Sequence, residues 1–234
     1  MNIRAVIFDV YGTLLEVGPP PPNAEDHWQA LCRNMLHTSA PVSRLNFFAA
    51  SSKVIARHHK AARERGIPWP EVHWPTVVAE VLPELAQLPR HDQEEFFFRQ
   101  IQTGHTTRLT EETATTLRTL LEGPALLGIA SNAQAYTLRE LGEALAQHGL
   151  GMALFEPDLC FWSFQHGFSK PDPHVFRILS ARLAERGILP HETLMVGDRL
   201  DNDIAPALAH GWQTRQFSPS CVQPSSGLGG CIPR

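Results

Sequence analysis

The sequence predicts an α/β fold: a parallel sheet with helices on both faces and one helical domain inserted near the amino terminus. Two observations favour this class. Short apolar, strand-like runs alternate with helical patterns over residues 110–217, which is the order that builds a parallel sheet. Residues 16–105 interrupt this alternation with helical patterns alone. A chain of 234 residues has room for one large domain with a sizeable insertion.

The first strand is expected at residues 5–8, which read Ala-Val-Ile-Phe. This run has no polar alternation, so it suits a strand buried on both faces of a parallel sheet. Asp9 ends the run, and Gly12-Thr13 breaks it directly afterwards. An acid at the carboxyl end of a central parallel strand lies where open α/β sheets bind their ligands. Taken alone, Asp9 could equally cap a turn.

The inserted segment is expected to be helical throughout, with no strand between residues 16 and 108. Helices are expected over 24–37, 41–65, 76–87 and 91–102. Four prolines at 19–22 form a linker, because proline fits neither a helix interior nor a central strand. Asn23 is expected to cap the first helix and Gly66 to end the second.

Beyond the insertion, helices and strands alternate again. Strands are expected at 125–130, 159–162, 193–196 and 214–217, and helices at 110–121, 134–148, after Lys170 and at 202–210. Residues 1–15 and 106–217 are therefore assigned to the α/β core and 16–105 to the insertion. The tail 218–234, rich in proline, serine, glycine and cysteine, is expected to be poorly ordered.

The amino-acid composition indicates which kinds of partner and which cellular compartment to expect. A formal net charge of −4 argues against nucleic acid or an anionic membrane as the main partner. No apolar run approaches the ~20 residues that span a bilayer, and the first strand leaves no room for a signal peptide. The four cysteines lack CxxC spacing, so reduced thiols in a cytoplasmic protein are expected, as a monomer or homodimer.

Polar side chains follow several of the predicted strands or open the next helix: Asp9, Ser131, Lys170, and Asp198 with Asp203. Because the carboxyl ends of parallel strands share one edge, these groups are expected to converge. Two carboxylates there would bind a hard divalent cation such as magnesium. A lysine and a hydroxyl could hold an anionic group beside it, and a carboxylate can act as a nucleophile.

In this order the motifs resemble those of the haloacid dehalogenase-like (HAD) hydrolase superfamily. The matching stretches are Asp9-Val10-Tyr11-Gly12-Thr13, Ser131-Asn132, Lys170-Pro171, and Gly197-Asp198 with Asp203. The resemblance covers residues 1 to about 217 and includes an insertion where members with a helical C1 cap carry theirs. It implies a Rossmann-like core with the cap over its active site.

The resemblance also implies how a substrate would be handled. Asp9 would be the nucleophile that takes up a phosphoryl group from a small phosphorylated metabolite. Ser131, Asn132 and Lys170 would hold that group. Lys170 would also offset the clustered carboxylates.

A metal site is implied by the same resemblance. Asp9, the backbone carbonyl of Tyr11 and Asp198 would coordinate Mg²⁺. Asp203 would lie behind these ligands and orient Lys170 or a water on the metal.

Tyr11 departs from the phosphatase pattern. Phosphatases of this family usually carry an aspartate two residues after the nucleophile, as general acid and base. Such catalysis is worth ~10²–10⁴-fold, and a tyrosine of pKa near 10 protonates an alkoxide less readily at neutral pH. Tyrosine at this position is what the 2-haloacid dehalogenases of the family carry, where aspartate displaces halide at carbon without a metal. Packing under the cap is a third reading of Tyr11.

The fourth motif favours the phosphatase, because the dehalogenases resemble SSNxxD where this chain has residues 197–203 with two aligned acids. Such acids need a cation beside them. The sequence therefore predicts a Mg²⁺-dependent phosphatase in which Tyr11 replaces the usual acid. A metal-independent 2-haloacid dehalogenase and a weakly active phosphoryl-binding protein are the alternatives.

Overall fold

The computed structural model describes residues 2–38 and 41–217. These residues form two compact units, which we call the α/β unit (described residues 2–17 and 107–217) and the helical unit (the described part of 18–106). The sequence placed the corresponding boundaries after residues 15 and 105. The predicted tail, with Cys221 and Cys231, lies outside the described residues.

The α/β unit is built on a five-stranded parallel sheet, which confirms the predicted fold class. The strands, in their order across the sheet, are β5 (Cys160–Trp162), β4 (Leu126–Ser131), β1 (Ala5–Phe8), β6 (Thr193–Gly197) and β7 (Gln213–Gln216). Ala5 pairs in register with Leu126 on one side and Thr193 on the other. The chain fills one side of β1 first and then crosses to the other, so the topological switch point lies beside β1.

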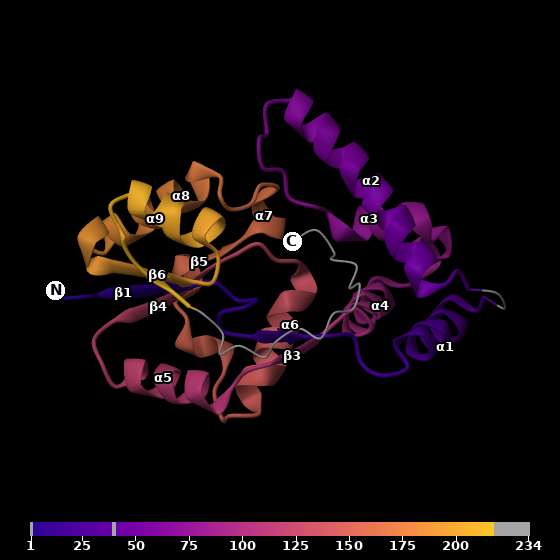
Figure 1. Ribbon diagram of the computed structural model, residues 1–234, viewed down its shortest axis with the longest axis horizontal. Helices are drawn as coiled ribbons and strands as arrows, with labels where there is room; N and C mark the ends of the chain where they lie inside the picture. Colours follow the sequence, from indigo (N-terminus) through magenta and orange to yellow (C-terminus); the bar gives the residue numbers. More distant parts are fainter. Residues whose placement is uncertain (1, 39–40, 218–234) are drawn as a thin grey trace. The chain divides into compact units, whose positions relative to one another are not determined.

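Helices cover both faces of this sheet (Figure 1). The helices α5 (Glu111–Leu121) and α6 (Ala135–Ala146) cover one face, and α8 (Pro173–Glu185) and α9 (Ala205–Ala209) cover the other. Val6 and Phe8 of β1 belong to the first apolar cluster, and Ala5 and Ile7 belong to the second. The strand is thus buried on both faces, as its apolar run predicts.

Two local features of the α/β unit differ from the prediction. A short helix, α7 (Ser163–His166), follows β5 at once. The helix expected over 202–210 is a π-helical turn (Leu200–Ile204) that leads into α9. Single 3-10 turns lie at Met152–Leu154, Pro157–Leu159 and Pro190–Glu192. Turns this short carry too few residues for a helical apolar stripe to show in the sequence.

The helical unit contains α1 (Ala24–Leu36), α2 (Arg44–Glu64), α3 (Trp74–Val81), a 3-10 turn (Pro83–Gln87) and α4 (Arg90–Gln102). Its core is aromatic: Trp28 lies 4.6 Å from Phe47 and 6.1 Å from Phe96 between ring centroids. The predicted cap on α1 is wrong, because Asn23 adopts a left-handed conformation and makes no capping hydrogen bond. The Ser43 hydroxyl caps α2, which therefore begins three residues after Pro41.

The expectation of no strand between residues 16 and 108 is also wrong. Two short strands, β2 (Glu16–Gly18) and β3 (Thr106–Arg108), pair at the points where the chain passes between the two units. Arg108 also donates a hydrogen bond to the Glu16 carboxylate, 92 residues away in the chain. Three-residue strands show no alternation that a sequence pattern could detect.

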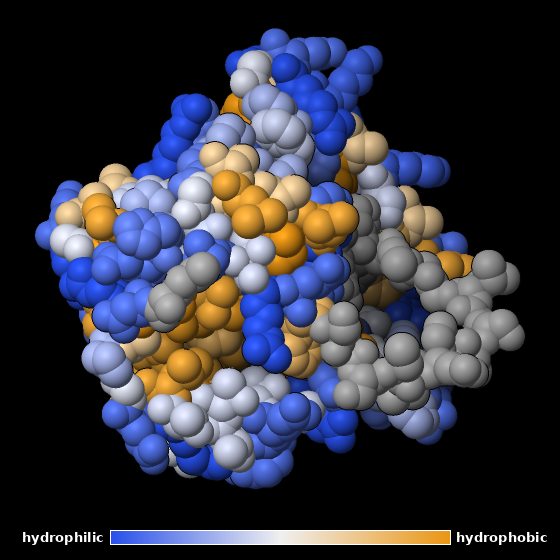
Figure 2. All heavy atoms as spheres, turned by 60° about the vertical axis from the view of Figure 1, so that its left-hand side comes forward, coloured by the Kyte–Doolittle hydropathy of each residue, from blue (hydrophilic) through white to orange (hydrophobic). Residues whose placement is uncertain are grey.

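The surface of the described chain carries scattered apolar side chains. On the face in Figure 2, apolar residues gather in patches between hydrophilic ones. Large exposed apolar residues of the α/β unit are Leu121, Leu189, Leu200 and Leu208. Exposed apolar residues are common on folded proteins, so they assign no function by themselves. Among the described helices, none combines the length and apolar character needed to cross a membrane.

Candidate active site

Asp9 follows β1 at the centre of the sheet. Its backbone N–H donates to the carbonyl of Val196 at 2.9 Å, which fixes the start of the loop against β6. Gly12 then has φ +85°, which an L side chain rarely adopts, and a Cβ at this position would lie 2.4 Å from Oδ2 of Asp198. Glycine therefore lets the loop after Asp9 approach Asp198 closely.

Three carboxylates meet at this edge. Asp9, Asp198 and Asp203 each offer an oxygen, and these oxygens all lie within 4.8 Å of one another. The π-helical turn directs Asp203 back toward the strand end, where its Oδ2 accepts from the Arg199 N–H at 3.0 Å. A Cβ on Gly197 would lie 2.5 Å from the Asp203 side chain. The sequence-predicted acids are thus brought together.

Lys170 lies among these acids and is 3% exposed. Its Nζ donates to Asp9 Oδ1 at 2.8 Å and to Asp203 Oδ1 at 2.5 Å. Burial disfavours the ammonium, but the two carboxylates outweigh that effect and raise the pKa of Lys170 above its ordinary value. Lys170 is therefore charged at neutral pH.

Asp9 is the acid most affected by burial. Loss of hydration raises the pKa of its carboxyl from the ordinary 3.8 to about 6, although the Lys170 ammonium pulls in the opposite direction. Asp203 and Asp198 add to the rise through like-charge repulsion. Keeping Asp9 ionised at neutral pH therefore costs free energy, and a nearby cation would lower that cost.

Asn132 contacts the backbone of Lys170. Its side-chain amide donates to the Lys170 carbonyl at 2.9 Å and accepts from the Lys170 N–H at 2.7 Å. The next residue, Ala133, is held by Ser163 Oγ at 2.8 Å. These bonds tie the loop after β4 to the segments that follow β5. The substrate contact expected for Asn132 stays a prediction.

Ser131 ends β4 with its side chain fully buried. Its hydroxyl has no hydrogen-bond partner among the residues that the structure describes, and the same holds for the buried hydroxyl of Thr13. A buried polar group without a partner is costly, typically ~1–3 kcal/mol. Ser131 therefore has a hydroxyl available to hold an anionic group, the role expected for it.

The phenol of Tyr11 contacts two side chains of helix α6. Its phenol oxygen lies 2.5 Å from Oε2 of Glu140 and 2.9 Å from Oγ1 of Thr137. Burial, and then the Glu140 carboxylate, raise the pKa of Tyr11 well above its ordinary value of 10.0. The phenol is thus a poor proton donor to a departing group at neutral pH.

A model of the haloacid dehalogenase-like hydrolase family matches residues 3–211. The chain belongs to this family. It is accordingly a hydrolase of the HAD type, and the family resemblance is confirmed. A comparison with functionally curated proteins gives no significant match.

Solved structures of HAD enzymes share the fold along nearly the whole chain. A 2-haloacid dehalogenase from Pseudomonas syringae pv. Tomato DC3000 is 21% identical with a TM-score of 0.59, over 99% of this chain and 92% of that one. The HAD family enzyme bt-2542 from Bacteroides thetaiotaomicron, solved with magnesium and inorganic phosphate, is 14% identical with a TM-score of 0.55, over 96% and 98%. The HAD-hydrolase YfnB from Bacillus subtilis, bound to magnesium, is 21% identical with a TM-score of 0.53, over 97% and 91%. At these identities the similarity shows the fold alone.

The donor set of this HAD site fits a magnesium ion. Among the described residues, the three carboxylates share the Lys170 ammonium, and the nearby Arg199 guanidinium is paired with Asp201, so a divalent cation would balance the remaining negative charge. All the groups are hard oxygen donors, which magnesium prefers over nitrogen or sulfur. The ligands that the family resemblance predicts are Asp9, Asp198 and the Tyr11 backbone carbonyl. The Asp203 carboxylate accepts a hydrogen bond from Lys170 instead.

Two residues bound to Tyr11 were missed by the sequence analysis. Thr137 and Glu140 lie on α6 among its buried residues, which include Leu141 and Ala144. A glutamate on the apolar stripe of an amphipathic helix is unusual, because charged residues are rarely buried without a partner. That position in the helical pattern is the signal that could have found Glu140.

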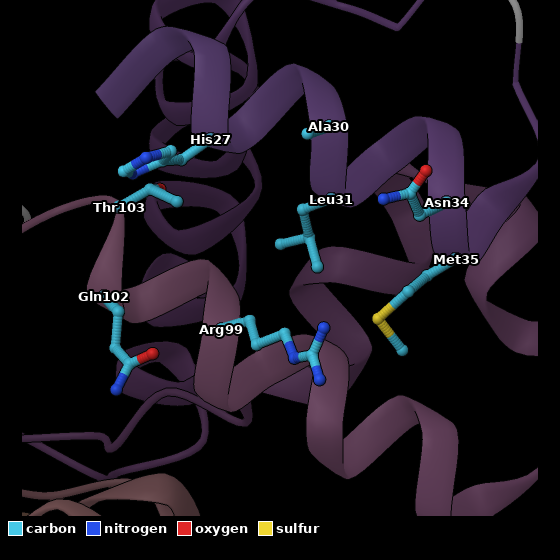
Figure 3. A pocket seen from close by; sticks show the side chains of 8 residues that line it. All are labelled: His27, Ala30, Leu31, Asn34, Met35, Arg99, Gln102 and Thr103. Atoms are coloured by element: carbon cyan, nitrogen blue, oxygen red, sulfur yellow. The ribbon is translucent and has the colours of Figure 1, made fainter. Parts of the chain in front are cut away.

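A groove of about 280 Å³ also lies within the helical unit. It is lined by α1 and α4, with Leu31 and Met35 facing Arg99 (Figure 3). None of the residues predicted for the HAD site contributes to it, and Arg99 is paired with Glu95 at 2.5 Å.

Proposed function

We propose that this HAD hydrolase is a Mg²⁺-dependent phosphatase that acts on a small phosphorylated metabolite through an aspartyl-phosphate on Asp9. The observation that carries the proposal is the cluster of three carboxylates around Lys170 at the end of the central strand. A site for a metal-independent reaction has no use for that much negative charge beside an anionic substrate.

In the proposed reaction a carboxylate oxygen of Asp9 attacks phosphorus, and the bond to the leaving oxygen breaks. Water then attacks the aspartyl-phosphate, releasing inorganic phosphate and restoring the Asp9 carboxylate. Lys170 and the hydroxyl of Ser131 hold the phosphoryl oxygens. Magnesium, held by Asp9, Asp198 and the Tyr11 carbonyl, would supply positive charge against these oxygens.

Two similar HAD structures support this proposal. The Bacteroides enzyme was solved with magnesium and inorganic phosphate, and the Bacillus hydrolase with magnesium. Both cover almost this whole chain. Magnesium and a phosphoryl group are therefore compatible with a HAD fold of this size.

The test is phosphate release from acetyl phosphate and p-nitrophenyl phosphate, first with magnesium and then with excess chelator. We expect turnover that needs magnesium and that Asp9→Asn abolishes, because the amide is not a nucleophile. More than a few per cent of activity left in Asp9→Asn would overturn the covalent mechanism. Tight Mg²⁺-dependent binding of phosphate without turnover would instead indicate a phosphoryl-binding protein.

A second candidate, a metal-independent 2-haloacid dehalogenase, is favoured by Tyr11 and by one of the similar structures. This residue matches the dehalogenase pattern, and the similar Pseudomonas structure is a 2-haloacid dehalogenase. In that reaction Asp9 would displace halide from carbon. Halide release that persists in chelator and is unchanged by Asp198→Asn would establish this candidate in place of the phosphatase.

A further inference from the structure

The hydroxyl of Tyr11 joins the loop that carries the nucleophile to helix α6. Its oxygen lies within hydrogen-bond distance of both Glu140 and Thr137. Thr137 is fully buried, and Glu140 is 5% exposed. Neither residue belongs to the HAD motifs described above.

The directions of these hydrogen bonds follow from counting protons. A phenol has one proton to donate, and an ionised carboxylate can only accept. The 2.5 Å contact is therefore the donation from Tyr11 to Glu140. The Thr137 hydroxyl then donates to the phenol oxygen at 2.9 Å, while it accepts from the Gln134 N–H at 3.2 Å. A continuous chain of hydrogen bonds thus runs from the start of α6 to Glu140.

This chain of bonds connects two parts of the catalytic edge. Tyr11 lies two residues after Asp9, and Gln134 lies three residues after Ser131. The strands β1 and β4 that carry these two groups are neighbours in the sheet, but their loops leave it separately. The hydroxyl of Tyr11 therefore links the loop of the nucleophile to the loop of the phosphoryl-holding serine. We call this hydrogen-bonded link, from Tyr11 to Glu140 and Thr137, the tie.

We propose that Glu140 is a positioning residue that, through the Tyr11 hydroxyl, sets the place of Asp9 relative to Ser131. The inference rests on the proposed function for its catalytic consequence. A carboxylate buried in the apolar stripe of α6 loses hydration, and the hydrogen bond from Tyr11 offsets part of that cost while the loop keeps this position. The pair therefore disfavours other positions of the loop.

The tie also affects which class of substrate the site can hydrolyse. The one proton of Tyr11 is committed to Glu140, so position 11 does not protonate the leaving group. Phosphate compounds whose leaving group departs as a stable anion, namely acyl and aryl phosphates, lose least from this arrangement. We therefore expect kcat for acetyl phosphate to exceed that for an alkyl phosphate.

The test uses substitutions at both ends of the tie in the 234-residue chain. Glu140→Gln keeps an oxygen that accepts from the phenol, whereas Glu140→Leu keeps the volume and removes the acceptor. Glu143→Ala is the matched control, because Glu143 lies on the same helix, is about half exposed and pairs with Arg139 at 2.8 Å. Tyr11→Phe, alone and combined with Glu140→Leu, tests whether Glu140 acts through the hydroxyl.

We expect Glu140→Leu to lower kcat for acetyl phosphate about tenfold or more with little change in KM, because small misplacements of reacting groups are costly. Glu140→Gln should restore kcat to within about threefold of the parent, and Glu143→Ala should match it. In the Tyr11→Phe background, Glu140→Leu should cost nothing further, because the tie is already broken. Equal and independent losses in the two backgrounds would overturn the proposal.

Hydrogen exchange of residues 9–15 gives a readout that needs no turnover. Their amides should exchange faster in Glu140→Leu than in the parent or in Glu143→Ala. If no phosphate compound is turned over but this exchange difference is found, the proposed function fails and the tie stands. A variant that merely loses stability, with unchanged exchange in this loop and unchanged kcat, would overturn the tie while the phosphatase stands.

Discussion

Single side chains hold the catalytic edge together: Lys170 contacts Asp9 and Asp203, and the Tyr11 hydroxyl contacts Glu140. The acids and Lys170 were predictable, because residues at strand ends meet at one edge of a parallel sheet. The partners of Tyr11 were not, because Glu140 lies 129 positions away and a charged residue in a helix normally faces water. A sequence pattern places side chains on faces, but it does not say which side chain from another element meets them there.

Gly12 offers a test of how closely the loop after Asp9 must approach Asp198. In Gly12→Ala, a methyl group would meet the Asp198 carboxylate in addition to the left-handed strain. We expect loss of Mg²⁺ affinity and of turnover, together with ~1–2 kcal/mol of stability from the strain alone.

Gly66→Ala is the matched control for this substitution. Gly66 has φ +87°, close to the +85° of Gly12, but nothing lies within 4 Å of its added methyl group. It should lose stability without losing Mg²⁺ affinity, as followed by calorimetric titration and urea unfolding. Equal losses of affinity in the two variants would show that strain, and not the contact with Asp198, is responsible.

The raised pKa of Asp9, about 6 in place of 3.8, predicts a pH dependence of the metal-free protein. Between these two values the folded chain holds a proton that the unfolded chain has lost. The free energy of unfolding should therefore fall as pH rises from about 4 to 6, relative to Asp9→Asn, which has no such proton. Urea unfolding of both proteins across this range measures the difference. A difference that changes in the opposite direction would contradict the assigned burial of Asp9.

At the level of helices, strands and loops, the site is made of loops that are joined to neighbouring segments by hydrogen bonds. The longer strands and helices were predictable from apolar periodicity, but β2, β3, α7 and the π-helical turn were not. Each of these pieces is too short to show a periodic apolar pattern, and β2 and β3 also depend on pairing with each other across the insertion. The π-helical turn matters most for the site, because it aims Asp203 at Lys170.

Two hydrogen bonds join the Asn132 side chain to the backbone of Lys170, and we expect their loss to have a clear effect on turnover. Asn132→Ala removes two hydrogen bonds, so the segment that carries Lys170 should move. We expect kcat for acetyl phosphate to fall about tenfold or more with KM little changed. Asn46→Ala, an exposed asparagine on α2, is the control and should leave both parameters unchanged. A rise in KM at constant kcat would instead support the substrate contact that the sequence predicted.

At the scale of the whole molecule, the chemistry and the insertion belong to different units. All the residues that we place in the catalytic edge lie in the α/β unit, which has an apolar cluster on each face of its sheet. The helical unit has its own aromatic core around Trp28 and Phe47. A unit with a separate core has the means to fold as a separate body. The family resemblance makes this second unit the expected cap, whose side chains would select the substrate.

This division predicts the result of removing the helical unit. The strands β2 and β3 pair at the two ends of the insertion, so a short glycine-serine linker can replace residues 19–105 without pulling the ends apart. We expect the shortened chain to unfold cooperatively, to bind Mg²⁺ and to keep measurable turnover of acetyl phosphate, because that substrate is too small to need selection. Its preference among larger phosphate esters should fall. A shortened chain that folds and binds Mg²⁺ but no longer hydrolyses acetyl phosphate would show that the helical unit supplies a group to the chemistry itself.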